Sequence, residues 1–250
     1  MLGISLVDLL GSVHREISVY GSGGFTSYKL PRLCEQLVTW ADQGIGRVKM
    51  KVGREPLRDP ERVSAARKAI GPDVELFVDA NGAYSRKQAL ALAFKYAEAD
   101  ITWFEEPVSS DDLEGLRIMR NRAPAAQHIA AGEYGYDSIY FRRMIEAGAV
   151  DVLHAEASRC AGVSGFLRVS ALCEAHCIPL SAHCCPALHL HLCCAAPRAI
   201  HLEYFHDHVR IERMLFDGAC TPANGQLKPD RSRPGMGLEL KRSDAAKFRA

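Results

Sequence analysis

The segment Arg47-Val48-Lys49-Met50-Lys51-Val52-Gly53 alternates two lysines with apolar residues just before a glycine. Side chains alternate between the two faces of a strand, so a strand here puts both ammonium groups on one face. Taken alone, this pattern is typical of a solvated edge strand, where lysines guard against aggregation. Whether the lysines point inward instead depends on the segments around them.

Similar short apolar segments recur at intervals of about 25 residues, each followed by a polar turn and a helical pattern. The expected strands are 17–20, 47–51, 75–79, 101–105, 128–131, 151–153, 178–182 and 200–203. The expected helices between them are 31–42, 59–70, 85–98, 111–121, 138–147, 162–175 and 187–196. This alternation predicts consecutive βα units around a parallel sheet.

Helix-start signals agree with this reading. Asp59-Pro60 offers an N-cap followed by proline, and Ser85 and Asp111 precede other helical runs. Eight strands alternating with helices predict an α/β fold, a TIM-type (β/α)7β barrel, with a doubly wound open sheet as the alternative. The segment Gly21-Ser22-Gly23-Gly24 lacks the spacing of a dinucleotide-binding loop, so the barrel is preferred.

Composition excludes several function classes. The 250 residues are 48% hydrophobic and 24% charged, which suits a large buried core. The net charge is +1 without a long basic run, so no nucleic-acid partner is expected. No membrane partner is expected either, because the apolar residues 1–10 include Asp8, lack a basic start and are too short to span a bilayer.

The nine cysteines are interpreted as free thiols in a reducing cytoplasm, because their number is odd and no export signal precedes them. Six lie between Cys173 and Cys194, among four histidines. Helical spacing within Cys173/Cys177 and His189/Cys193 raises a zinc hypothesis. The absence of Cys-x-x-Cys pairs disfavours it, and most of these cysteines fall where small apolar residues would pack a helix.

Barrel chemistry sits at the carboxyl ends of the strands. The ionisable residues at these positions are Lys49, Lys51, Asp79, Glu105, Glu133, Glu156, His183 and Glu203. A single acid after a strand is more often a helix cap or a solvated turn. Repetition at strand end after strand end instead predicts one charged site at the barrel mouth.

Asp79, Glu105 and Glu133 follow three consecutive strands, and neighbouring strands lie ~4.8 Å apart. Three carboxylates at that spacing repel one another unless a cation lies between them. Oxygen ligands favour magnesium over zinc. Such an ion would hold a substrate carboxylate and stabilise an enediolate while a neighbouring base removes the α-proton.

Several motifs together resemble the enolase superfamily, specifically its mandelate racemase/muconate lactonizing enzyme subgroup. They are Lys49-Met50-Lys51, Val78-Asp79-Ala80-Asn81, Trp103-Phe104-Glu105-Glu106-Pro107, Ala131-Gly132-Glu133, Ser181-Ala182-His183 and Leu202-Glu203-Tyr204. The resemblance runs from about residue 17 to Pro234-Gly235-Met236-Gly237. As a set the motifs are specific, although Lys-x-Lys or Glu-Glu-Pro alone would be weak.

The resemblance implies one Mg²⁺ per chain, held by Asp79, Glu105 and Glu133, with Glu106 behind these ligands. Lys51 matches a base on one face of the substrate. Lys49 matches its neighbour, which contacts the substrate carboxylate and lowers the pKa of Lys51 by like-charge proximity.

Further matches complete the implied site. His183 matches the acid/base on the opposite face, and Glu203 the residue that hydrogen-bonds the carboxylate as it becomes an enediolate. The positions that often line the pocket are Asn81, Tyr20 and Ser22.

Two departures from the family pattern lie close together. Glu156 stands where an aspartate usually orients the histidine, and a misplacement of ~1 Å can cost ~100-fold in rate. Glu156 is expected to pair with His183, and the alternative is a surface acid paired with Arg159. Ala161 replaces a usual glycine.

Family members carry an α+β domain before the barrel that closes over its mouth. The expected domains here are a linker remnant at 1–16, the barrel at 17–216 and a C-terminal extension packing on it at 217–250. Without the cap, the site would be open to water and apolar surface exposed. A fragment, a degenerate paralogue and a protein with a separate cap all remain open.

The expected activity is that of a lyase that dehydrates an acid sugar. A 2-hydroxy-acid racemase or epimerase is the second hypothesis, followed by a non-catalytic metal-binding barrel and, last, a zinc protein. The expected partner is a small-molecule carboxylate, and a homo-oligomer is expected.

Overall fold

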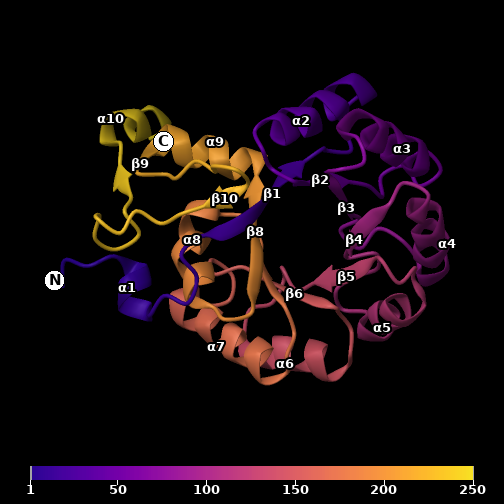
Figure 1. Ribbon diagram of the computed structural model, residues 1–250. Coiled ribbons are helices and arrows are strands. Elements are labelled where there is room, and N and C mark those ends of the chain that lie inside the picture. The colour runs from indigo at the N-terminus through magenta and orange to yellow at the C-terminus, as the bar shows by residue number, and fades with distance from the viewer. Residues whose placement is uncertain (1, 250) are drawn as a thin grey trace.

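The computed structural model describes residues 2–249 and contains a closed barrel of eight parallel strands ringed by helices (Figure 1). The strands are β1 (Ile17–Gly23), β2 (Arg47–Lys51), β3 (Glu75–Asp79), β4 (Ile101–Glu105), β5 (His128–Ala131), β6 (Val152–Ala155), β7 (Leu180–Ala182) and β8 (Ala199–Phe205). The helices between them are α2 (Leu30–Asp42), α3 (Asp59–Ile70), α4 (Arg86–Ala97), α5 (Leu113–Arg122), α6 (Ser138–Glu146), α7 (Gly162–Ala175) and α8 (Pro186–Ala195). The predicted TIM-type fold is confirmed.

Strand pairing closes the barrel and aligns its charged ends. β1 pairs with both β2 and β8, and Tyr20 lies opposite Glu203. In the next pairs, Lys51 lies opposite Asp79, and Asp79 lies opposite Glu105. This register places the charged residues at one rim of the barrel.

The bounds of β2 to β5 agree with the sequence pattern, whereas β6 and β7 begin later than predicted. Asp151 lies just before β6, and its carboxylate accepts hydrogen bonds from Ile129 N and Arg120 Nε. β7 begins after Pro179, whose nitrogen cannot donate to a strand ladder.

Two predicted helix caps also need correction. Ser85 caps α4 through a reciprocal capping box with Gln88, as its residue type suggests. Asp112, rather than Asp111, caps α5 by accepting from Gly115 N. Asp59 lies inside α3, where its carboxylate accepts from Gly53 N and from the Tyr84 hydroxyl.

Two hydrophobic clusters hold the barrel. The larger one lies between strands and helices, and its side chains include Val48, Met50 and Leu33. The smaller one consists of Tyr20, Phe77, Trp103, Ala130 and Val152. Phe77 and Trp103 stack with ring centroids 5.2 Å apart. The residues of this smaller cluster come from strands between β1 and β6. They are the apolar neighbours of Lys49 and Glu105.

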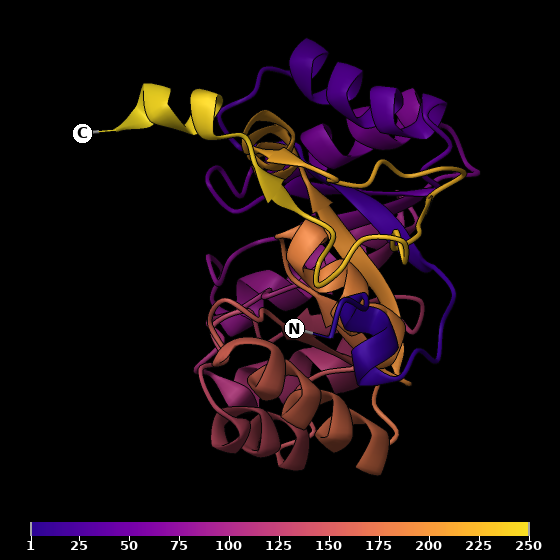
Figure 2. The ribbon, with the colours of Figure 1, turned by 90° about the vertical axis from the view of Figure 1, so that its left-hand side faces the viewer.

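Segments outside the barrel pack on its surface or project from it. They are α1 (Leu6–Leu10), α9 (His206–Leu215), β9 (Phe216–Asp217), β10 (Gln226–Leu227), β11 (Glu239–Leu240), α10 (Arg242–Ala245) and the 3-10 helix Ala246–Phe248. β10 pairs with β1, whereas the C-terminal helix stands away from the barrel (Figure 2). Within residues 2–249, no helix is long and apolar enough to cross a lipid bilayer.

Candidate metal and proton-transfer site

The two lysines of β2 point into the barrel. Lys49 has no exposed surface, and its Nζ lies 2.6 Å from Glu105 Oε2 and 2.9 Å from Glu203 Oε1. Lys51 is the more accessible of the two and forms an ion pair with Asp79. The edge-strand interpretation of this segment is therefore excluded.

Lys49 lowers the pKa of Lys51 as expected, but other charges outweigh this effect. Burial lowers the pKa of Lys51, and the charge of Lys49 lowers it further. The charges of Asp79, Glu105 and Glu203 act in the opposite direction and prevail, so the pKa lies above its ordinary value. Lys49 is visible as a neighbour in the sequence, whereas the three acids that face Lys51 come from other strands.

The carboxylates of Asp79, Glu105 and Glu133 are all buried. Asp79 and Glu105 end β3 and β4, and Glu133 follows β5 by two residues. Gly132 makes this position possible because its φ is +132° and a Cβ there would lie 2.2 Å from His154 O. Donor atoms of Glu105, Glu133 and His154 lie within 4.8 Å of one another.

The acidic groups have unusual proton affinities. Burial and the charge of Glu105 raise the pKa of Asp79 to about 7. Burial and the charge of Glu133 raise the pKa of Glu106 to about 9, and within residues 2–249 Glu106 Oε1 has no hydrogen-bond partner. Such a buried, oxygen-only acidic group fits a hard divalent cation such as Mg²⁺.

His183 follows β7 and faces three acids. Its Nδ1 lies 2.9 Å from Glu156 Oε2, and its Nε2 lies 3.1 Å from Glu133 Oε2 and 3.7 Å from Glu203 Oε2. Burial lowers the pKa of His183, but Glu203 and the other partners raise it well above its ordinary value.

Glu156 is buried and lies between His183 and Arg159. Its Oε2 lies 3.3 Å from Arg159 Nε, so this carboxylate has both of the partners that the sequence offered as alternatives. Although burial opposes it, hydrogen bonding from His183 and Ser158 lowers the pKa of Glu156 to about 2. The side chain is therefore an anion next to the imidazole.

Arg159 also reaches Glu133, because its NH1 donates to Glu133 O at 3.0 Å. The backbone before α7 turns through Ala161, which adopts the left-handed conformation with a φ of +69°. Glycine adopts this conformation at lower cost than alanine. The segment nevertheless places Glu156 beside His183.

Glu203, on β8, is the last of the charged residues around the barrel rim. Its Oε1 accepts from Ser22 Oγ at 2.5 Å, and its Oε2 accepts from Cys184 N at 2.9 Å. Burial opposes ionisation, but Lys49 and His183 lower the pKa of Glu203.

Two of the three expected pocket-lining residues are placed differently. Tyr20 has no exposed surface, and its hydroxyl lies 3.0 Å from His154 Nε2 inside the barrel. Ser22 is equally buried beneath Glu203. Both therefore lie beneath the charged residues of the rim, because the inward-facing residues of β1 fill the barrel. Asn81 is exposed and lies with Lys51 along a hollow of about 400 Å³.

Sequence reasoning missed three residues that contact this site. His154 Nδ1 lies 3.5 Å from Glu105 Oε1, Trp103 Nε1 donates to Glu105 Oε2 at 2.9 Å, and Cys184 Sγ lies 3.3 Å from His183 Nε2. His154 and Trp103 lie two positions before an ionisable residue at the end of a strand, and Cys184 directly follows one. This spacing in the sequence could have identified them as neighbours of the site.

The zinc hypothesis built on helical spacing is not supported by the described part of the chain. Cys173 and Cys193 are buried in the hydrophobic core. His189 Nε2 accepts a hydrogen bond from Ala157 N at 2.8 Å, so this nitrogen is occupied by the backbone. Of the cysteines and histidines between residues 173 and 194, only His183 and Cys184 belong to a potential metal-binding group found within residues 2–249.

Apolar side chains are exposed in the loops after two strands at the same rim. Leu57 follows β2 and is 97% exposed, and Tyr136 follows β5. These side chains lack cover within the described residues.

A family model described as enolase C-terminal domain-like matches residues 32–245. L-talarate/galactarate dehydratase of Salmonella typhimurium is 33% identical over 205 residues, which cover 81% of this chain and 51% of the dehydratase. The chain thus spans about half the length of this curated relative.

Solved structures agree with this result. A mandelate racemase/muconate lactonizing enzyme-like protein from Rubrobacter xylanophilus is 59% identical with a TM-score of 0.97, covering 100% of this chain and 69% of that protein. L-talarate dehydratase from Polaromonas sp. JS666, solved with Mg and L-glucarate, is 31% identical with a TM-score of 0.89, covering 99% and 68%. This chain therefore belongs to the enolase superfamily, in its mandelate racemase/muconate lactonizing enzyme group.

Proposed function

We propose that this protein is a Mg²⁺-dependent enzyme that abstracts the α-proton of a carboxylate substrate and dehydrates an acid sugar. One observation carries the proposal: three buried carboxylates on β3 to β5 lie between Lys51 on β2 and His183 after β7. A dehydratase relative and the glucarate-bound dehydratase structure support the choice of substrate class.

Asp79, Glu105 and Glu133 would hold the Mg²⁺. When bound, the ion would supply positive charge that stabilises the substrate's developing enediolate. Glu106, which is buried and senses the charges of Glu133, Asp79 and Glu105, would support these ligands from outside the coordination sphere. Arg159, which contacts Glu133 and Glu156, would position both acids.

In the proposed reaction, Lys51 in its neutral form removes the proton from the carbon next to the carboxylate. A cation held by Asp79 and Glu105 would offset the charges that raise the pKa of Lys51. Lys49 would contact the substrate carboxylate, and Glu203 would donate a hydrogen bond to it only in a protonated form, as charge develops. His183, oriented by Glu156, gives a proton to the β-hydroxyl, which leaves as water. The remaining enol becomes a 2-keto acid. Asn81 would contact the substrate at the exposed rim.

Racemisation or epimerisation of a 2-hydroxy acid is the second candidate. It is favoured by the placement of two potential bases, Lys51 and His183, on strands separated by β8 and β1 around the barrel. A proton removed by one base could return from the other to the opposite face.

The test is incubation with Mg²⁺ and a library of sugar acids in deuterated water, followed by NMR. A 2-keto product supports dehydration, and α-deuteration with a mixture of stereoisomers supports racemisation. Silence across the library would favour a non-catalytic metal-binding barrel.

Substitutions at Lys51 and His183 test which residue acts as the base on each face of the substrate. Lys51→Ala and His183→Ala should each abolish exchange on one face of the substrate, so that they affect opposite stereoisomers. Lys68→Ala and His176→Ala, at exposed positions, serve as matched controls and should exchange like the unaltered protein. Equal residual exchange in the two site variants contradicts the assignment.

Three further proposals concern the whole protein. We place it in the cytoplasm, which the nine free cysteines support. We also propose a homo-oligomer, to be tested by light scattering after size exclusion. The division into segments 1–16, 17–216 and 217–250 can be tested by limited proteolysis.

A further inference from the structure

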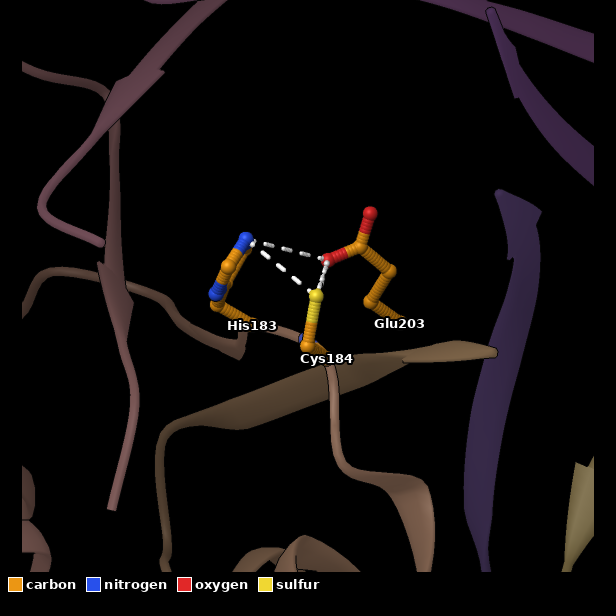
Figure 3. A group of neighbouring side chains, drawn as sticks. All are labelled: His183, Cys184 and Glu203. Carbon is orange, nitrogen blue, oxygen red and sulfur yellow. Dashed lines mark hydrogen bonds and ion pairs between the residues drawn. The ribbon is translucent and has the colours of Figure 1, made fainter. Parts of the chain in front are cut away.

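Donor atoms of three different kinds, from His183, Cys184 and Glu203, face one another at the barrel rim (Figure 3). Cys184 Sγ lies 3.3 Å from His183 Nε2 and 3.4 Å from Glu203 Oε2, and the latter two atoms are 3.7 Å apart. All three residues are buried. The proposed reaction uses His183 and Glu203 but gives the thiol no task.

The triangle formed by these atoms has the size of one face of a tetrahedral zinc site. Zinc lies about 2.3 Å from sulfur and about 2.0–2.2 Å from nitrogen or oxygen, so the edges of such a face measure about 3.3–3.6 Å. The three observed distances lie within a few tenths of an ångström of this range. A cation could therefore meet all three donors with little rearrangement.

Neighbouring hydrogen bonds fix the orientation of the donors. Glu156 holds His183 Nδ1, which leaves Nε2 facing the triangle. Ser22 and Lys49 occupy Glu203 Oε1, which leaves Oε2 on the same side. Carboxylates that hold a histidine in this way are typical supports of zinc ligands.

We propose that His183, Cys184 and Glu203 form a binding site for Zn²⁺ or a cation of similar softness, distinct from the oxygen-only magnesium group. Binding would displace two protons to solvent, that of the Cys184 thiol and that of His183 Nε2, and the thiolate and carboxylate would balance the charge of the ion.

This inference goes beyond the proposed function, because an ion at this site would occupy His183 Nε2. His183 could then neither accept nor donate a proton. Zinc would therefore inhibit the enzyme even when Mg²⁺ is saturating, although His183 Nε2 also lies 3.1 Å from Glu133 Oε2, one of the proposed magnesium ligands.

Cobalt is a suitable probe because thiolate-bound Co²⁺ absorbs strongly in the near ultraviolet. Co²⁺ is titrated into the protein under saturating Mg²⁺, with no substrate present. The unaltered protein should show a thiolate charge-transfer band that saturates at one equivalent. Cys184→Ser should lack the band, since serine keeps the space and the polar contacts but not the sulfur.

Cys185→Ser is the matched control, because Cys185 is adjacent and its Sγ lies 3.3 Å from another histidine nitrogen, His208 Nδ1. This variant should keep the band. No band in the unaltered protein, or a band that survives Cys184→Ser or disappears in Cys185→Ser, overturns the proposal.

Calorimetry with Zn²⁺ provides a second measurement. Cys184→Ser and His183→Asn should each weaken zinc binding at least 10-fold, whereas unchanged affinity in either variant contradicts the ligand set. Because neither measurement uses substrate or turnover, a negative result would leave the proposed dehydration untouched.

Discussion

Lys49 carries a charge at a position without exposed surface, and its neighbours make this possible. Its Nζ lies within 4 Å of carboxylate oxygens of Glu105, Glu203 and Asp79. Burial lowers the pKa of Lys49, but the charges of Glu105 and Glu203 raise it well above its ordinary value. A buried charge in this setting is tied to its partners, so removing it leaves them uncompensated.

We predict that Lys49→Met destabilises the protein by about 3–5 kcal/mol in the presence of a chelator, because two buried carboxylates lose their cation. Urea denaturation measures this free energy. Lys68→Met, at an exposed helical position, should stay within about 0.5 kcal/mol of the unaltered protein. A similar small effect for both variants would show that the buried ion pairs contribute little.

At the scale of elements, the start of α5 shows that residue type alone does not identify a helix cap. Asp111 and Asp112 are chemically equivalent candidates for its cap, but only Asp112 accepts from Gly115 N. Asp112 also receives two hydrogen bonds from Arg86 at the start of α4. One aspartate thus caps α5 and connects it to the preceding helix.

We predict that Asp112→Ala lowers the free energy of unfolding by about 1 kcal/mol, because the first turn of α5 loses its acceptor. Asp111→Ala is the matched control and should change it by less than about 0.5 kcal/mol. Thermal denaturation followed by circular dichroism compares the two. A larger loss for Asp111→Ala would mean that the helix starts one residue earlier.

At the scale of the whole molecule, the barrel collects acids from four of its eight strands at one rim. Asp79, Glu105, Glu133 and Glu203 come from β3, β4, the β5 loop and β8. The raised pKa of Asp79, about 7, comes from burial and from the neighbouring carboxylate of Glu105. A divalent cation that bound here would relieve this repulsion and stabilise the folded state.

We predict that Mg²⁺ at about 100 times its dissociation constant stabilises the protein by about 2.7 kcal/mol, and that EDTA reverses the effect. Differential scanning calorimetry measures it as a rise in melting temperature. Asp79→Asn should lose the rise, whereas Asp73→Asn, which alters an exposed acid before β3, should keep it. An equal rise in both variants would place the ion elsewhere.

The sequence alone determined the strands and the side of the barrel on which the chemistry lies. The alternation in Arg47–Lys51 and the acids that end Glu75–Asp79 and Ile101–Glu105 are local patterns, and the bounds of these strands agree with the prediction. Period-two alternation decides by itself which side chains share a face. For this reason, Lys49 and Lys51 could be grouped with the acids before any contact was known.

Only the tertiary structure decided which of these groups meet. Closure of β1 against β8 brings Ser22 to Glu203 across 181 positions of sequence, and the same closure turns Tyr20 into the barrel interior. It also surrounds Lys51 with anions, which reverses the expected direction of its pKa shift. Local periodicity does not contain these contacts, because they depend on how eight strands close around a shared centre and on which side chains fill it.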